Sequence, residues 1–236
     1  MDSKAAIHTE YGKELTVDTV QLPEPRPDQV IVKLHSSGIC HSQLHQMHNP
    51  EGPTPSLLGH EGTGTVIAKG SDVDHLEEGD LAIVTWVNRD PVRGRPVYPA
   101  TGVTYNEAPL NGATYTWGQH VLVRSGYVVK IPKTSDKYNS SIVGCAVLTG
   151  AGAVLHTAKV RPEESVAIFG VGGVGLSSLI MASILEAFPI IAVDISDEKL
   201  EFAKKFGATH TINSSKEDPV NAIHEITSGG ADYSFD

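Results

Sequence analysis

Four side chains that can bind a metal or move a proton fall within a short segment near the N-terminus. The segment "GICHSQLH", residues 38–45, holds a thiol, two imidazoles and a hydroxyl, and another histidine follows at position 48. Thiolate sulfur and imidazole nitrogen are ligands of zinc, and a hydroxyl and an imidazole can pass a proton between them. A polar loop that is simply rich in histidine is the alternative interpretation.

Two further segments supply matching ligands. "GHEGTG", residues 59–64, holds His60 and Glu61 between glycines, and the second of the two cysteines is Cys145. Cys40, His60 and Cys145 would supply two thiolates and one imidazole, and a catalytic zinc site keeps one position open for water or substrate. Each residue alone is typical of a buried thiol, a turn histidine or an exposed acid. The case for a metal therefore depends on what the rest of the chain supplies.

A glycine-rich segment indicates that the chain binds a dinucleotide. "GVGGVG", residues 170–175, fits G-x-G-x-x-G, follows an apolar run typical of a strand and opens an expected helix. The glycines allow a tight turn, a close approach of the backbone to a pyrophosphate and close packing of helix on strand, with the helix N-terminus facing the phosphate charge. We therefore expect the phosphates to bind at Gly170, Gly172, Gly173 and Gly175. A nicotinamide-type fold in turn favours a metal at the cysteine and histidine ligands, because hydride transfer from an alcohol needs an electrophile on the oxygen.

An acidic residue about 20 positions further on indicates the cofactor type. Asp194 ends the next expected strand, where a carboxylate can accept hydrogen bonds from the adenosine ribose and would repel a 2′-phosphate. NAD is therefore favoured over NADP, although an aspartate at a strand end can also cap the next helix. Lys199 could reach the same ribose or be a solvated helix lysine.

The elements that must hold these side chains are of two kinds. The first ~150 residues are β-rich, with short β-branched runs separated by Gly, Pro, Asp and Asn, which predicts a small antiparallel barrel or sandwich. Strands are expected over 30–32, 65–67, 81–84, 120–123 and 127–129. Residues 86–118, rich in Pro, Gly and Asn, predict a long irregular lobe, and residues 144–158 predict a helix.

From Ser165 onward the pattern alternates between strand and helix. Strands are expected over 166–169, 190–193, 209–212 and 231–235, and helices over 174–187, 198–206 and 219–226. This order predicts a parallel, doubly wound α/β sheet. The expected domains are therefore a β-rich domain over 1–150 and a partial dinucleotide-binding domain over 151–236.

Composition excludes several classes of partner. The chain has 236 residues, 40% of them hydrophobic and 19% charged, with a formal net charge of −10. The negative charge argues against nucleic acid and anionic membranes. Neither a secretory signal nor a membrane-spanning segment is evident, so a cytoplasmic protein with a small-molecule substrate is expected.

Taken together, the motifs resemble the zinc-dependent alcohol dehydrogenases of the medium-chain dehydrogenase/reductase superfamily. The resemblance covers essentially the whole chain from Ala5 to Asp236. It is carried by "GICHSQLH", "LLGHEGTGTVIAKGSDV", the Cys145–Thr149–Gly150 segment and "VAIFGVGGVGLSSL" with "IIAVDISDEKL". It implies a GroES-like catalytic domain followed by a Rossmann domain, and hydride transfer between an alcohol and NAD that gives an aldehyde or ketone. Full-length relatives form homodimers or homotetramers.

The resemblance also implies individual roles. Cys40, His60 and Cys145 match the catalytic zinc ligands, and Glu61 matches an acid that can act as an alternative ligand. Ser42 matches the hydroxyl that takes the substrate proton, and His45 matches the imidazole that relays it through the cofactor ribose. The remaining cofactor positions are His41 on the pyrophosphate and Thr149 and Val174 on the nicotinamide.

Three departures from the family pattern matter. Gln43 occupies the position where many relatives have an aspartate that is hydrogen-bonded to the zinc-ligating histidine. We therefore expect His60 to be a weaker donor to the metal, and Gln43→Asp to bind zinc more tightly. Residues 86–118 contain no cysteine, so one zinc per chain and no structural zinc is expected. Relatives continue for roughly 100 residues, completing the sheet, so a C-terminally truncated fold is expected.

Three alternatives to a simple alcohol dehydrogenase follow. A zinc dehydrogenase acting on a polyol or sugar is one. A chain that binds zinc or nucleotide without turnover is another. A zinc-free quinone reductase of the same superfamily is disfavoured, because all three ligands are present.

Overall fold

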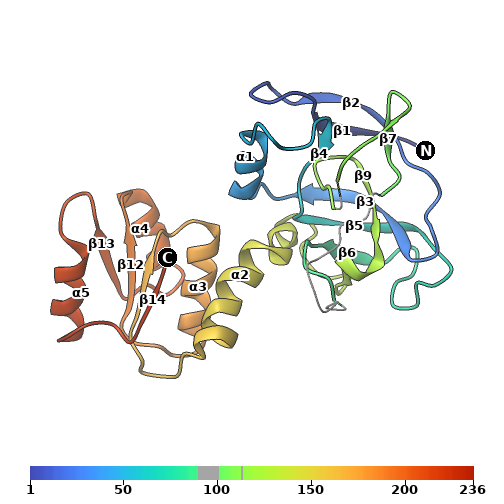
Figure 1. Ribbon diagram of the computed structural model, residues 1–236. Coiled ribbons are helices and arrows are strands. Elements are labelled where there is room, and N and C mark those ends of the chain that lie inside the picture. The colour runs from blue at the N-terminus through green and yellow to red at the C-terminus, as the bar shows by residue number, and fades with distance from the viewer. Residues whose placement is uncertain (90–100, 113) are drawn as a thin grey trace. The chain divides into compact units, whose positions relative to one another are not determined.

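The computed structural model describes residues 1–89, 101–112 and 114–236. The chain forms two compact units, Met1–Cys145 and Ala146–Asp236, which Figure 1 shows in blue to green and in yellow to red. The expected irregular lobe over 86–118 falls partly on residues 90–100 and 113, which lie outside the described residues.

The first unit is built from two antiparallel five-stranded sheets. One has the order β4-β1-β2-β7-β8 and the other the order β10-β6-β5-β3-β9. The strands of the first sheet are β1 (Asp2–His8), β2 (Thr16–Gln21), β4 (Ser56–Leu57), β7 (Thr104–Tyr105) and β8 (Ala108–Pro109). Those of the second are β3 (Gln29–Ser37), β5 (Gly62–Lys69), β6 (Leu81–Val84), β9 (His120–Arg124) and β10 (Val128–Lys130).

The core of this unit is formed by the side chains that point to the inner face at every second position of the strands. In β1, Ser3, Ala5 and Ile7 are buried on one face, as a period of two requires. Val30, Val32 and other β-branched residues of the second sheet belong to the same apolar cluster as β1. The two sheets therefore share one hydrophobic core.

The pairing of β3, β5 and β6 collects chemically active segments at one edge. The end of β3 pairs with the start of β5 through Ser37 and Gly62. The start of β5 pairs in turn with the end of β6, Gly62 opposite Val84. The segments that follow β3, precede β5 and follow β6 therefore meet at the same place.

Short helices complete the first unit. Helix α1 (His41–Met47) follows β3, and the 3₁₀ helices are η1 (Ser125–Tyr127) and η2 (Asn139–Gly144). η2 packs near β3, β5 and β6, and Cys145 follows directly after it.

The second unit is a parallel sheet of order β13-β12-β11-β14. Its strands are β11 (Val166–Phe169), β12 (Ile190–Asp194), β13 (His210–Asn213) and β14 (Tyr233–Phe235). Its helices are α2 (Ala146–Gly152), a π-helical turn η3 (Ala153–Ala158), α3 (Gly173–Ile184), α4 (Asp197–Lys204) and α5 (Pro219–Thr227). The order 3-2-1-4 of these strands is that of the first four of the six strands in a dinucleotide-binding fold.

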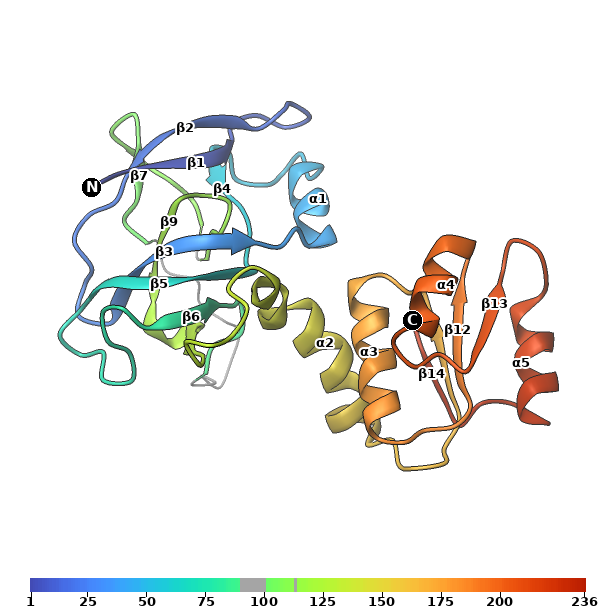
Figure 2. The ribbon, with the colours of Figure 1, turned by 180° about the vertical axis from the view of Figure 1, so that it is seen from behind.

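Each face of this sheet is covered by its own apolar cluster. Leu179 of α3 and Leu200 of α4 pack with Ile168 on one face, whereas Ile223 of α5 packs with Ile191 on the other. Figures 1 and 2 show α3 and α5 on opposite sides of the sheet. Such coverage of both faces explains why the strands are continuous apolar runs rather than alternating ones.

The predicted α/β class, with a β-rich unit preceding a parallel sheet, is confirmed. The helix expected over 174–187 ends earlier, because Glu186 adopts a left-handed conformation with φ of 58° before the chain enters β12. Within residues 1–89, 101–112 and 114–236, every helix is too short or too polar to cross a lipid bilayer.

Candidate active site

Four ligand-bearing residues converge at the edge formed by β3, β5 and β6. Cys40, His60, Glu61 and Cys145 offer ligand atoms that all lie within 4.8 Å of one another. The sulfur atoms of Cys40 and Cys145 are 3.9 Å apart, although 105 positions separate the residues in sequence. All four belong to the first unit.

Main-chain hydrogen bonds hold the ligand segments in place. The amide of Gly38 donates to the carbonyl of Glu61 at 2.9 Å, which ties the approach to Cys40 to the His60–Glu61 segment. The amide of Glu61 donates to Oγ1 of Thr116 at 3.2 Å. On the other side, the Thr85 hydroxyl donates to the carbonyl of Gly144 at 2.5 Å, which fixes the turn before Cys145.

The protonation states of the clustered side chains are consistent with a bound cation. Burial raises the pKa of Cys145 to about 12, with further contributions from the neighbouring Cys40 and Glu61. Two thiols and a carboxyl group this close cannot all ionise unless a positive charge compensates them. A divalent cation supplies that charge and deprotonates coordinating thiols. The donor set of two sulfurs, one imidazole and one carboxylate suits zinc.

One nitrogen of His60 is buried without a hydrogen-bond partner among the described residues. Burial lowers the pKa of His60, which favours the neutral imidazole that metals require. Its Nε2 is buried and makes no hydrogen bond with the described residues. An uncompensated buried nitrogen is costly, and a metal ion would satisfy it.

The other nitrogen of His60 is bonded to Gln43. Nε2 of Gln43 lies 2.8 Å from His60 Nδ1, and Oε1 of Gln43 is buried without a hydrogen bond to the described residues. Turning the amide by 180° would let Oε1 accept from Nδ1–H and leave His60 Nε2 with its lone pair. That orientation is the one compatible with a metal on Nε2.

The two residues predicted to carry the substrate proton, Ser42 and His45, lie on α1. The Ser42 hydroxyl donates to the sulfur of Cys40 at 3.3 Å, so it lies next to the ligand group. His45 is exposed and follows one helical turn later, with its ring 5.1 Å from that of His41. Positions three and four apart share a helix face, so the half-buried Ser42 and the exposed His45 run from the pocket toward solvent.

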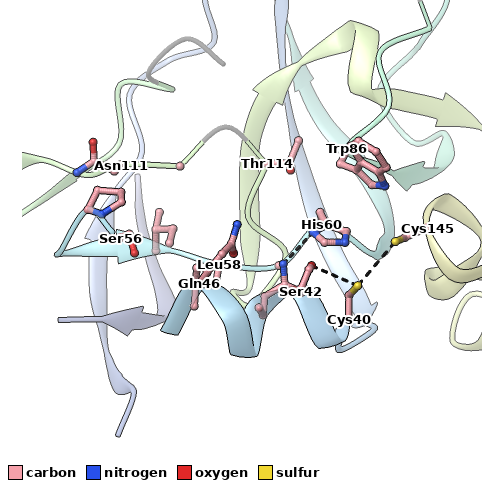
Figure 3. A pocket seen from close by; sticks show the side chains of 15 residues that line it. Cys40, Ser42, Gln46, Ser56, Leu58, His60, Trp86, Asn111, Thr114 and Cys145 are labelled. Atoms are coloured by element: carbon pink, nitrogen blue, oxygen red, sulfur yellow. Dashed lines mark hydrogen bonds between the residues drawn. The ribbon is translucent and has the colours of Figure 1, made fainter. Parts of the chain in front are cut away.

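A cavity of about 800 Å³ opens beside the cluster. Figure 3 shows Cys40, His60 and Cys145 at one end of it and Asn111 and Ser56 at the other. Trp86 stands over the metal end, with its ring 6.4 Å from that of His60 at an interplanar angle of 62°. The cavity volume is therefore large enough to hold a whole small-molecule substrate beside the cluster.

In the second unit, the glycine-rich turn has the shape required for a pyrophosphate. Gly170 has a φ of +80°, and a Cβ on Gly175 would come within 1.9 Å of the carbonyl oxygen of Gly170. A Cβ on Gly172 would meet nothing within 4 Å, so this side of the turn is open. The predicted loop is thus folded as a tight turn that leads directly into α3.

Asp194 is bonded to that turn. Its carboxylate accepts from the amide of Val171 at 3.0 Å and from the amide of Ser196 at 3.0 Å. Burial raises the pKa of Asp194, but these hydrogen bonds and the charge of Lys199 outweigh it, and the net pKa is lowered. Ser196 caps α4. Asp194 therefore stays charged beside the cofactor turn rather than serving as the helix cap.

The residues predicted to contact the nicotinamide lie where α2 packs on the start of α3. Thr149 and Val174 are both exposed there, next to Gly150, where a Cβ would approach the carbonyl of Val174 to 2.2 Å. Their predicted role, and that of His41, stays a prediction.

Comparison with known proteins agrees with this arrangement. Residues 26–133 match the family model described as alcohol dehydrogenase GroES-like domain, and residues 173–236 match zinc-binding dehydrogenase. An S-(hydroxymethyl)glutathione dehydrogenase of Synechocystis sp. is 34% identical, with all of this chain aligned to 71% of that protein. A relative of the same name from Escherichia coli is 31% identical over the same shares.

Solved structures give the same result. A benzyl alcohol dehydrogenase from Acinetobacter calcoaceticus superposes with a TM-score of 0.89 at 34% identity, covering 99% of this chain and 70% of that one. An alcohol dehydrogenase zinc-binding domain protein from Burkholderia ambifaria gives 0.93 at 33% identity over the same shares. A zinc-binding dehydrogenase from Sinorhizobium meliloti, bound to NADP, gives 0.77 at 28% identity, covering 94% of this chain and 65% of that one.

A GroES-like unit with a thiolate–imidazole cluster, followed by a dinucleotide-binding sheet, defines a metal-dependent oxidoreductase. The chain belongs to the zinc-dependent alcohol dehydrogenase family of the medium-chain dehydrogenase/reductase superfamily. It is thus a zinc-dependent oxidoreductase that uses a nicotinamide cofactor and an alcohol as its small-molecule substrate, which confirms the predicted family and reaction class.

Several pocket residues were not predicted from sequence. Trp86, Gln46, Asn111 and Thr114 line the cavity although none belongs to a motif. Their positions depend on how distant segments fold together, so no local pattern indicates them. Thr116, which fixes the amide of Glu61, was missed for the same reason.

Proposed function

We propose that this chain oxidises a simple alcohol to its aldehyde or ketone with NAD, and that Cys40, His60 and Cys145 hold the single zinc. The observation that carries the proposal is the convergence of these ligands, with Glu61, within 4.8 Å beside the pocket. Zinc bound there would polarise the alcohol oxygen and lower its pKa.

The chain's own residues handle the proton. Ser42, adjacent to Cys40, takes the proton of the substrate hydroxyl, and His45 passes it to solvent. Glu61 lies within the ligand cluster and serves as an alternative ligand. Leu58 and Trp86, which line the cavity, exclude water from the reacting carbon.

The second unit selects the cofactor. The turn at residues 170–175 holds the pyrophosphate, and the charged carboxylate of Asp194 accepts from the ribose hydroxyls and repels a 2′-phosphate. Lys199, whose charge acts on Asp194, would contact the same ribose. These features support NAD rather than NADP.

The test is absorbance in the reduced-nicotinamide band with a panel of alcohols, with zinc measured on the same sample. Turnover that requires zinc and prefers NAD to NADP supports the proposal. Bound zinc without turnover of any alcohol would instead support a chain that binds zinc or nucleotide only. Turnover of polyols but not of simple alcohols would support the sugar-type alternative.

A further inference from the structure

The cavity has two chemically different ends. At the metal end lie Cys40, His60 and Cys145, and at the far end lie Ser56 and Asn111 (Figure 3). Leu57, Leu58 and Pro53 also line the cavity and contribute apolar surface to it. A substrate whose hydroxyl is at the metal end would therefore place an apolar body along these walls.

The cavity is also lined by polar side chains that form few or no hydrogen bonds with other described residues. The Gln46 amide and the Ser56 hydroxyl make no hydrogen bond with other described residues, although both line the cavity. Asn111 makes one long contact, from Nδ2 to the carbonyl of Pro55 at 3.4 Å. These groups keep donors and acceptors available for a ligand.

The described lining is also without charge outside the ligand cluster. Among the described residues that line the cavity there is no lysine, arginine or aspartate. The whole chain carries a formal net charge of −10, which repels anions at long range. Against the lysine- and arginine-free lining that the described residues form, an anionic substituent would lose its hydration without an ion pair in return, which is costly.

We propose that the pocket beyond the metal end binds an uncharged hydrogen-bonding substituent of the substrate, through Gln46 and Ser56. The substrate class is then an alcohol with a bulky apolar or aryl body and a neutral polar group distal to its hydroxyl. This inference rests on the proposed function for the orientation of the hydroxyl. It disfavours adducts that carry carboxylates, such as those of glutathione.

The test uses three para-substituted benzyl alcohols of nearly the same shape. These are 4-(hydroxymethyl)benzamide, which is neutral and polar, 4-isopropylbenzyl alcohol, which is apolar, and 4-(hydroxymethyl)benzoate, which is anionic. Binding to the zinc-loaded chain is measured by calorimetry, and turnover is measured with NAD. We expect the amide to bind about tenfold more tightly than either of the others, as one or two net hydrogen bonds provide.

Variants identify the residues responsible. Gln46→Leu and Ser56→Ala should each reduce the preference for the amide over the isopropyl compound by about threefold to tenfold. Gln21→Leu is the matched control, because Gln21 is exposed on β2 and does not line the cavity. It should keep the full preference.

The outcomes separate this inference from the proposed function. Equal binding of the three alcohols, tightest binding of the benzoate, or a preference that survives both pocket variants would overturn the inference, whatever the turnover. Selective binding of the amide without reduction of NAD would instead contradict the proposed function and leave the inference standing.

Discussion

Gln43 joins His60 through a neutral amide, with Nε2 of Gln43 2.8 Å from Nδ1 of His60. A carboxylate at this position would accept a hydrogen bond from Nδ1–H and make Nε2 a stronger donor to a metal. The amide can accept the same bond through Oε1, but it brings no charge. The zinc of this chain is therefore expected to be held less tightly than the ligand set alone would allow.

Gln43→Asp should tighten zinc binding by about tenfold, because such outer partners change metal affinity by 10- to 100-fold. The measurement is the zinc retained during competition with a chelator of known affinity. Gln46→Asp is the matched control, since it adds the same charge one turn further along α1. Equal zinc retention in Gln43→Asp and wild type would contradict the expectation.

Cys40→Ala should abolish zinc binding, whereas Ser42→Ala should keep the zinc and lose turnover. Removing a thiolate breaks the ligand set, but removing the hydroxyl affects only proton transfer, which contributes about 10²- to 10⁴-fold to a rate. Zinc content and kcat are measured on the same preparations. A Ser42→Ala chain with wild-type kcat would remove Ser42 from the proton path.

One zinc per chain is expected, because the sequence holds two cysteines and both lie in the single described cluster. Elemental analysis of the zinc-loaded chain gives the stoichiometry directly. A value near two would show a second site that does not depend on thiolates.

Asp194→Asn should reduce the preference for NAD over NADP by about tenfold, because it removes the charge that repels a 2′-phosphate. The side-chain oxygen that remains can still accept from the amide of Val171, so the turn is expected to persist. Titration of each reduced cofactor, followed by its fluorescence, gives the two dissociation constants. An unchanged ratio would assign the discrimination to other residues.

Asp80 should make stability depend on pH. Lys130 Nζ lies 2.8 Å from the buried carboxylate, and this hydrogen bond, with one from the amide of Glu77, lowers the pKa of Asp80 below 3.8. A depressed pKa contributes stability above the unfolded value of 3.8, and this contribution is lost as the pH falls through the folded pKa.

Asp80→Asn should therefore lower the free energy of unfolding at neutral pH by about 1–3 kcal/mol. Denaturant unfolding at neutral pH and at stepwise lower pH measures the gap between variant and wild type. The gap should narrow as the pH falls below 3.8. A gap that stays constant with pH would mean that the charge of Asp80 does not contribute.

The parallel sheet and its glycine turn were predictable because local patterns define them. The apolar runs of β11 and β12 and the glycines at 170–175 are contiguous in sequence. β1 was missed because Ser3 occupies a buried position and obscures the alternation. α1 was missed because only Gln43 of its seven residues is buried, so it lacks an apolar face.

The ligand types were predictable, but the surroundings of the ligands were not. Cys40 and Cys145 could be proposed together from the family pattern, whereas their separation of 3.9 Å depends on the pairing of β3, β5 and β6. The outer pocket around Gln46 and Ser56 likewise arises from long-range packing. Sequence patterns that extend over a few residues carry no signal for it.

The assignment of the zinc to Cys40, His60 and Cys145 is tested most directly by X-ray absorption at the zinc edge of the loaded chain. Two sulfur ligands at about 2.3 Å, with nitrogen or oxygen completing the shell, are expected. The Cys145→Ser chain should show one sulfur fewer or no bound zinc. A zinc shell made only of nitrogen and oxygen in the wild-type chain would contradict the assignment.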